Sequence, residues 1–378
     1  MRFEFLFFDA VDPSLGRVDR ESLSQQALME MVIEGIANKE AICGDPDEPK
    51  DIEEWKGVAV EDGEVTEIDW CKFDIGGSLQ LEWLPSSVKE FSVGGNRLAG
   101  TIEWASLPIS MKTLDLRFNK FTGSLDVERL SERMEYLNVY YNKFDGSLKL
   151  SSLPDTLTHF LASNNGFSGT VDLTRLPAAL AMLNLSDNLL SGPVVLTQLP
   201  SNLQDLHLVD NHFSGLIDLE SLPEGMGNLD VSYNEFCGSL KLDSFPDTLT
   251  DFFAFENEFS GSIDFTQLPA SLQSLKLSKN QLSGSVMLTQ LPAHLELLII
   301  SGNQFSGCLD LTRLPSSISS LRVNENAFSG TLDLSQLPQA LVELNLSEND
   351  LSGEVFIPDA LFDAVEVENT KLIKRHME

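Results

Sequence analysis

The stretch that decides the fold runs from Leu114 to Leu137 and reads LDLRFNKFTGSLDVERLSERMEYL. Its motif, LxLxxNxFxGxLxL, ends in a polar turn and then begins again. The asparagine recurs every 23 residues without an insertion, and a glycine follows four residues after each one. The asparagines are Asn96, Asn119, Asn142, Asn165, Asn188, Asn211, Asn234, Asn257, Asn280, Asn303, Asn326 and Asn349. A repeat of this length predicts a solenoid, in which each coil contacts only its neighbours.

Each repeat is expected to have three sides. Alternation in Leu114-Asp115-Leu116 predicts a short strand with the leucines inside, and stacking of one strand per coil predicts a parallel sheet. Alternation in the Gly-x-Leu-Asp-Leu segment, as at residues 123–127, predicts a second sheet of short strands. The Leu-Pro-x-x-Leu segment, as at residues 176–180, predicts a turn or 3₁₀ segment, because proline cannot donate to a ladder.

Structural roles explain the residues that recur in every coil. The asparagine amide can bond backbone groups exposed where the chain turns off the first sheet, in its own and adjacent coils. Two residues later the coils carry phenylalanine or leucine, which are expected to stack from coil to coil in the core. The following glycine permits a positive φ or a close approach of the backbone. We therefore expect none of these residues to be catalytic.

The repeat resembles the leucine-rich repeats of plants and unicellular eukaryotes, over about residues 65–357. The resemblance implies a right-handed superhelix, with the first sheet on the concave side, the second sheet beside it, and turns or 3₁₀ segments on the convex side. WKGV at 55–58, with the segment 63–68, is similar to the plant-type N-terminal cap CxWxGVxC followed by GxVxxL. Glu53 and Val60 occupy its cysteine positions, so the disulfide of that cap cannot form.

Three regions follow from this pattern. Residues 1–64 are predicted to be an N-terminal cap, 65–357 a lead-in and twelve repeats, and 358–378 a C-terminal cap or tail. A helix is expected over about 19–37, and residues 44–54 read as an acidic surface loop. The residues expected to cover the last coil are Leu361, Phe362, Val365 and Val367.

Composition excludes several classes of function. The net charge of −33 would repel phosphate backbones and anionic lipids, so we expect no nucleic-acid partner; it fits either plain solubility or a basic protein partner. The chain has no apolar run long enough to span a membrane. Phosphate-loop and dinucleotide-binding motifs are missing, as is metal-ligand spacing, so neither an enzyme nor a cofactor is expected. The four cysteines form no CxxC pair, which favours a reducing compartment, the cytoplasm.

A longer period lies over the short one. The segment GSLKLSSLPDTLT beginning at Gly146 matches GSLKLDSFPDTLT beginning at Gly238, 92 residues later. This distance equals four repeats, so a block of four repeats is inferred to have been duplicated. A duplicated scaffold that differs on one face points to that face as the variable part.

The variable face is the outward side of the first sheet, at positions six, four, two and one residues before each asparagine. All four tyrosines fall there, and Tyr, Phe and Arg dominate binding energy at protein interfaces. The candidate partner-binding residues are Arg117, Phe118, Tyr136, Tyr140, Tyr141, His207, Tyr233, Phe253, Phe255 and Ile299. Acidic residues surround them, which suits a basic, partly apolar protein or peptide.

We therefore expect a non-enzymatic scaffold for protein–protein recognition on the concave face. Stacking of exposed aromatics across neighbouring strands, which would only stabilise the sheet, is the competing interpretation. A secreted or surface receptor-like ectodomain lacking its signal peptide is an alternative, for which glycans on the sequons at Asn184 or Asn345 would be evidence. A structural subunit of a larger assembly is another.

Overall fold

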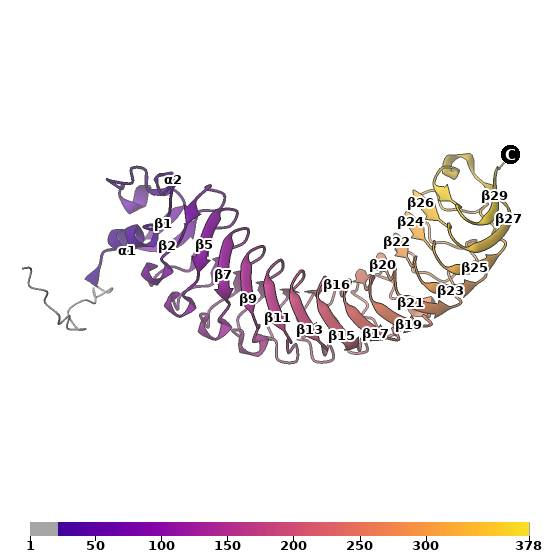
Figure 1. Cartoon of the computed structure of the whole chain (residues 1–378), viewed down its shortest axis with the longest axis horizontal. Coiled ribbons are helices and arrows are strands. Elements are labelled where there is room, and N and C mark those ends of the chain that lie inside the picture. The colour runs from indigo at the N-terminus through magenta and orange to yellow at the C-terminus, as the bar shows by residue number, and fades with distance from the viewer. Residues whose placement is uncertain (1–21, 378) are drawn as a thin grey trace, which may run out of the picture.

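The structure is a computed structural model that describes residues 22–377, and it is a solenoid bent into an arc (Figure 1). Two sheets follow the arc, one of 15 strands and one of 14 strands in the described part of the chain. The first sheet lines the inner, concave side (Figure 1). In both sheets, successive coils supply neighbouring strands, so the order in space follows the order in sequence.

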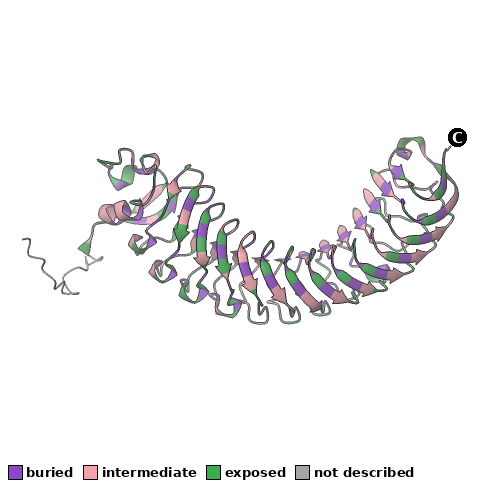
Figure 2. Ribbon diagram, viewed as in Figure 1, coloured by how far each residue is buried: buried purple, intermediate pink, exposed green. Residues whose placement is uncertain are grey.

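The first sheet pairs in a constant parallel register from β2 to β26, as where Leu114 faces Leu137. Its strands are β1 (Val58–Glu61), β2 (Glu64–Asp69), β4 (Glu90–Ser92), β6 (Thr113–Asp115), β8 (Tyr136–Asn138), β10 (His159–Leu161), β12 (Met182–Asn184), β14 (Asp205–His207), β16 (Asn228–Asp230), β18 (Asp251–Phe253), β20 (Ser274–Lys276), β22 (Leu297–Ile299), β24 (Ser320–Arg322), β26 (Glu343–Asn345) and β28 (Val365–Glu366). In most of these strands the central residue is buried and its neighbours are half-buried, as Figure 2 shows in purple and pink. The predicted alternation is therefore confirmed.

The second sheet lies one segment earlier in the repeat than predicted. Its strands are β3 (Gly76–Gly77), β5 (Arg97–Thr101), β7 (Lys120–Ser124), β9 (Lys143–Gly146), β11 (Gly166–Gly169), β13 (Leu189–Gly192), β15 (His212–Leu216), β17 (Glu235–Gly238), β19 (Glu258–Gly261), β21 (Gln281–Gly284), β23 (Gln304–Gly307), β25 (Ala327–Gly330), β27 (Asp350–Ile357) and β29 (Lys371–His376). These strands contain the phenylalanine and glycine, whereas the Leu-Asp-Leu segment follows them.

The chain turns at that segment in every type of coil, including one where Lys149 makes no capping bond, and in many coils an aspartate caps the turn. Asp126 accepts a hydrogen bond from the N–H of Glu128 at 3.2 Å, and Asp310 accepts one from Thr312 at 3.0 Å. Such a side chain begins a turn or 3₁₀ helix instead of extending a ladder. The 3₁₀ helices in and around the repeats are η3 (Leu81–Trp83), η4 (Trp104–Ser106), η5 (Val127–Arg129), η6 (Leu150–Ser152), η7 (Phe265–Gln267) and η8 (Asp359–Leu361). The Pro-x-x-Leu segment forms a turn, as where Leu180 N–H donates to Pro177 O at 3.0 Å.

The asparagines form a continuous ladder at the corner between the two sheets. In Asn211, Nδ2 donates to Leu208 O at 3.3 Å and Val209 O at 3.1 Å in its own coil, and to Leu185 O at 3.0 Å in the preceding coil. Its Oδ1 accepts from the N–H of Leu190, also in the preceding coil, at 3.0 Å. Each ladder asparagine thus joins two coils while it satisfies backbone groups at the corner between the sheets.

Phenylalanine rings fill the core beside this ladder. The rings of Phe144 and Phe167 are stacked with centroids 6.4 Å apart, and those of Phe305 and Phe328 are stacked at 6.3 Å. All four rings are buried. The glycine after each phenylalanine has a positive φ, as at Gly146 with φ 80°, which L side chains rarely adopt.

The N-terminal helix is shorter than predicted, and residues 1–21 lie outside the described residues. Helix α1 (Gln25–Val32) begins after Ser24, whose Oγ accepts from the N–H of Ala27 at 3.2 Å. It ends because the chain then crosses the first edge of the second sheet, where Ser78 N–H donates to Gly35 O at 2.9 Å. The short α2 (Glu40–Cys43) and η2 (Ile52–Glu54) flank the acidic loop.

A shortened coil closes the C-terminal end. Val365 pairs with Leu344, only 21 residues earlier, and Thr370 takes the place of a ladder asparagine by donating to Val367 O at 2.6 Å. Lys374 reaches across the end of the core, where its ammonium donates to Phe362 O at 2.5 Å and Val365 O at 2.7 Å. The expected closing residues pack here, with Leu361 and Val365 buried and Phe362 and Val367 partly buried.

We predict that Asn211→Ala destabilises the solenoid by about 2 kcal/mol or more, since buried backbone groups lose their partners. The measurement is the urea unfolding midpoint together with hydrogen exchange of the two joined coils. Asn202→Ala is the control, because this exposed side chain makes one hydrogen bond, to Ala178 O. Equal losses of stability in the two variants would refute the structural role of the ladder.

Candidate functional site

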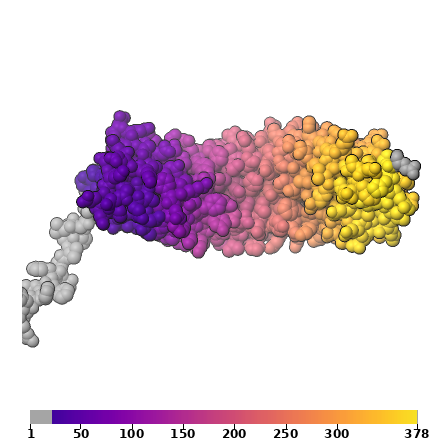
Figure 3. Space-filling model, turned by 90° about the horizontal axis from the view of Figure 1, so that it is seen from above, coloured from indigo at the N-terminus to yellow at the C-terminus, as the bar shows by residue number. Residues whose placement is uncertain are grey.

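The concave face is built from four positions in each coil, named −6, −4, −2 and −1 by their distance in sequence from the ladder asparagine. The −6 and −4 residues are the first and last residues of a strand of the first sheet, and the −2 and −1 residues follow that strand. Figure 3 is turned to look onto the open side of the arc, where the coils form one unbroken surface. The structure places all ten candidate residues at these positions, half-buried or exposed.

Three aromatic side chains gather near the N-terminal end of this face. The ring centroid of Phe118 lies 4.8 Å from that of Tyr140 and 5.3 Å from that of Tyr141. Arg117 is next to them, with Nε 3.3 Å from a carboxylate oxygen of the buried Asp115. These residues, which come from two successive coils, form what we call the first aromatic cluster.

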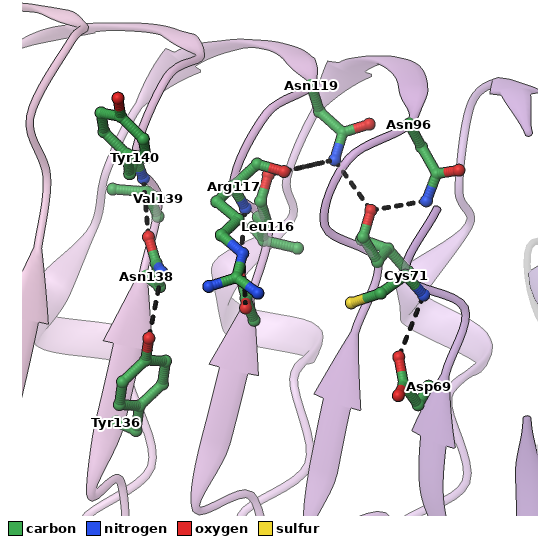
Figure 4. A network of polar contacts seen from close by, with 12 residues as sticks. Asp69, Cys71, Asn96, Leu116, Arg117, Asn119, Tyr136, Asn138, Val139 and Tyr140 are labelled. Carbon is green, nitrogen blue, oxygen red and sulfur yellow. Dashed lines mark hydrogen bonds and ion pairs between the residues drawn. The ribbon is translucent and has the colours of Figure 1, made fainter. Parts of the chain in front are cut away.

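Asn138 bonds the Tyr136 side chain and the Tyr140 backbone in this region (Figure 4). Its Nδ2 donates to the Tyr136 hydroxyl at 3.0 Å, and its Oδ1 accepts from the N–H of Tyr140 at 3.0 Å. The Tyr136 ring also lies beside His159, with centroids 5.8 Å apart. Tyr136 is thus committed to contacts within the sheet, as the competing interpretation of the aromatics expects.

A shallow hollow of about 460 Å³ opens beside the first aromatic cluster. Its walls come from the −4, −2 and −1 positions of five successive coils. The residues that line it include Arg117, Phe118, Tyr140, Leu161, Asp187 and His207. The hollow therefore brings the candidate His207 to the same surface as Arg117, Phe118 and Tyr140, although they are far apart in sequence.

A second aromatic cluster lies further along the arc. The rings of Tyr233 and Phe255 meet edge to face with centroids 5.1 Å apart, and Lys276 Nζ lies 4.5 Å from the centroid of Phe253. Ile299 is in register with Lys276 on the next coil, so Lys276 stands between it and Phe253 in the sheet. The lysine was not among the candidates, because a lone basic residue in an acidic chain gives no signal of a cation–π contact.

The −1 position holds the strongest signal that the sequence did not reveal. Here the backbone is left-handed in coil after coil, a conformation that glycine, asparagine and aspartate tolerate best. Phe118, Tyr141 and Tyr233 nevertheless occupy it, with φ of 51°, 53° and 52° and with 44%, 54% and 48% of their surfaces exposed. Bulky residues cost about 1–2 kcal/mol there. Such an unfavourable conformation at exposed residues makes this column a candidate functional surface.

Carboxylates separate the two clusters. Asp187 and Asp210 follow each other at the −1 position, and neither forms an ion pair within the described residues. Partial burial raises the pKa of Asp187, and repulsion from Asp210 raises it further. A cationic group placed between these carboxylates would relieve that repulsion.

The −4 position decides whether a backbone N–H stays free on this face. An aspartate or asparagine side chain at −4 accepts a hydrogen bond from the backbone N–H of the −2 residue, as Asp230 does from Ser232 at 3.0 Å. Burial raises the pKa of Asp230. Where Leu161 or Phe253 stands at −4, the N–H of Ser163 or Phe255 has no partner among the described residues. These free donors face the open side and can bind a ligand carbonyl.

The described part of the chain lacks a metal-binding cluster. No three of its His, Cys, Asp and Glu side chains lie close enough together to hold a metal ion. Cys43, Cys71, Cys237 and Cys308 are free thiols. None of the described helices is long and apolar enough to cross a bilayer.

Comparison with known proteins supports the fold. No protein-family model matches the sequence, and no curated protein is similar to it. Among solved structures, a TDR receptor aligns over 82% of this chain and 67% of its own, with 22% identity and a TM-score of 0.58. The leucine-rich repeat ectodomain of the receptor kinase GASSHO1/SCHENGEN3 from Arabidopsis thaliana aligns over 78% of this chain, with 25% identity and a TM-score of 0.59.

YopM from Yersinia enterocolitica aligns over 78% of this chain as well, with 26% identity and a TM-score of 0.56. The chain spans only 41% of the GASSHO1/SCHENGEN3 chain and 63% of YopM. These neighbours come from a plant and a bacterium, so they share the coil geometry with this chain without fixing its partner.

We predict that Tyr233→Asn is less destabilising than Phe255→Asn by at least about 1 kcal/mol. Both variants lose the same ring pair, but only Tyr233 leaves a left-handed backbone position that asparagine tolerates. Urea unfolding midpoints of the two variants measure the difference. An equal or larger loss in Tyr233→Asn would show that the tyrosine is not strained.

We predict that Asp230→Asn raises the thermal midpoint at pH 7. Its raised folded pKa means that the native state binds the proton more tightly, so stability falls as pH rises from the ordinary value of 3.8 through the folded pKa. Asparagine does not titrate, so it removes this loss of stability with rising pH. Its Oδ1 can still accept the hydrogen bond from the Ser232 N–H, as Asn138 Oδ1 does from the Tyr140 N–H.

Asp310→Asn is the control of opposite sign. Hydrogen bonds from Thr312 lower the pKa of Asp310, so its contribution to stability is present above the ordinary value and is lost as pH falls. Thermal midpoints between pH 3.5 and 8 should separate the two variants. A lower midpoint for Asp230→Asn at pH 7 would contradict the assignment.

Proposed function

Because this chain is a leucine-rich repeat protein, we propose that it is a non-enzymatic scaffold that binds a protein or peptide on the concave face of its first sheet. The observation that carries the proposal is the presence of Phe118, Tyr141 and Tyr233 at left-handed, exposed positions. Their rings also contact rings of neighbouring coils, yet bulky side chains are disfavoured on a left-handed backbone, which supports a role beyond stacking. A partner that covers the rings would offset the strain.

The charge of the concave face favours a basic, partly apolar partner. Asp187 and Asp210 stand unpaired between the aromatic clusters, and the whole chain carries a net charge of −33. Complementary charge speeds encounter and selects among partners, while buried aromatic anchors supply most of the affinity. The plant ectodomain similar to this chain was solved in complex with CASPARIAN STRIP INTEGRITY FACTOR 2, so binding of a factor is compatible with the fold.

A receptor-like or surface ectodomain is the second candidate for the biological setting. The match to a plant receptor ectodomain favours it over the cytoplasmic location that the cysteines suggested. Asn184, one of the two sequon asparagines, lines the hollow beside the first aromatic cluster. A glycan there would fill part of the proposed binding surface, so intact-mass analysis of the native protein tests the setting and the accessibility of the face together.

We predict that Tyr140→Ser, Phe253→Ser and Phe255→Ser, combined in one chain, abolish recovery of the partner in quantitative affinity capture from the native source. Each substitution removes a half-buried aromatic anchor from the concave face. Leu216→Ser with Val342→Ser is the matched control, because these apolar side chains are 73% and 75% exposed outside the concave face. Recovery unchanged in the triple variant but lost in the control would place the binding surface elsewhere.

A further inference from the structure

We propose that the concave face binds one extended peptide segment with two bulky apolar side chains about six residues apart and a lysine or arginine between them. This inference rests on the proposed function, and it specifies the partner. It comes from two equivalent subsites that the duplicated block of repeats places four coils apart.

The first subsite combines three features on two successive coils. Tyr141 holds an exposed aromatic ring at a left-handed position on one coil. On the next coil, Leu161 stands at −4 and lies in the wall of the hollow. Because leucine cannot accept a hydrogen bond, the N–H of Ser163 stays free toward the concave side.

The second subsite repeats the same three features 92 residues later. Tyr233 holds the left-handed position, Phe253 stands at −4 on the next coil, and the N–H of Phe255 has no partner among the described residues. Each subsite thus offers an aromatic surface, an apolar side chain and one backbone donor. Two sites of the same chemistry at a fixed interval suit a ligand with two matching anchors.

The interval determines the spacing of those anchors. Four steps of about 4.8 Å between neighbouring strands amount to about 19 Å. An extended chain rises about 3.3 Å per residue, so about six residues span that distance. The free N–H groups favour an extended ligand over a helix, because the carbonyls of an extended chain are available as acceptors, whereas those within a helix are already paired.

The residues between the subsites determine the charge. Asp187 and Asp210 occupy the −1 position on the coils between Tyr141 and Tyr233, with no ion pair in the described chain. No lysine or arginine stands at the concave positions of the coils between the two tyrosines, where the basic side chains are His159 and His207. The lysines and arginine nearest this interval are already engaged, Arg117 with Asp115, Lys279 with Glu256, and Lys276 with the Phe253 ring. A basic residue near the middle of the ligand would therefore meet both carboxylates while its neighbours fill the two subsites.

The test is selection from a displayed library of random dodecapeptides on the full chain, followed by fluorescence anisotropy with synthetic peptides. We expect enriched peptides to carry two bulky apolar residues five to seven positions apart with Lys or Arg between them. The synthetic probe carries two leucines six residues apart with a lysine between them. Shortening the leucine spacing from six to three should weaken binding about tenfold, because only one leucine can then occupy a subsite.

Variants of the chain separate this inference from the proposed function. Tyr141→Ser and Tyr233→Ser should each weaken the six-spaced probe about tenfold, and Asp187→Asn with Asp210→Asn should weaken it and flatten its salt dependence. Leu216→Ser, outside the concave face, should leave affinity unchanged. Peptides that need the concave tyrosines but show no spacing preference would overturn the two-subsite inference alone. Selected peptides whose affinity is unchanged by the substitutions on the concave face would overturn the proposed function as well.

Discussion

The constraint on which the structure depends is the hydrogen bonding of the ladder asparagines. Each side chain bonds its own coil and the preceding one, as Asn211 does with Leu208 and Leu185. The amide satisfies backbone groups at the corner between the sheets and sets the distance between coils. Because this bond set repeats without an insertion, the residues outside the core need not contribute to the fold, and the concave positions can vary.

The same ladder imposes the left-handed backbone beside it. To place the amide inside the corner, the chain reverses its twist at −1, and φ there is close to 53° whether the residue is Asp187, Glu256 or Tyr141. The coil geometry sets this φ angle, and the residue type at −1 does not change it. An aromatic ring at this position is therefore the feature on which the proposed binding surface rests. This separates Tyr141 and Tyr233 from Tyr136, whose contacts lie within the sheet.

Much of the fold could be read from sequence because its period is exact to the residue, and a few features could not. The Leu-Asp-Leu segment alternates like a strand, yet the side chain of Asp310 bonds the N–H of Thr312 and turns the chain away, which period-2 patterning cannot reveal. The two aromatic clusters were visible as unexpected residue types at outward positions. The left-handed backbone at the −1 position was not predicted. Gly95, Asn164 and Gly302 occupy the same position as Phe118 in their coils, and these residue types are typical of a positive φ.

The site depends on how rigid coils present weak features in series. A single exposed tyrosine, one free N–H or one carboxylate binds little alone in water. The ladder fixes each at a known interval, so a ligand that meets several of them loses conformational freedom once and gains from every contact. This explains why duplication of a four-coil block is a productive change for such a chain. It copies Tyr141, Leu161 and the Ser163 N–H as Tyr233, Phe253 and the Phe255 N–H, and the solenoid itself supplies their spacing.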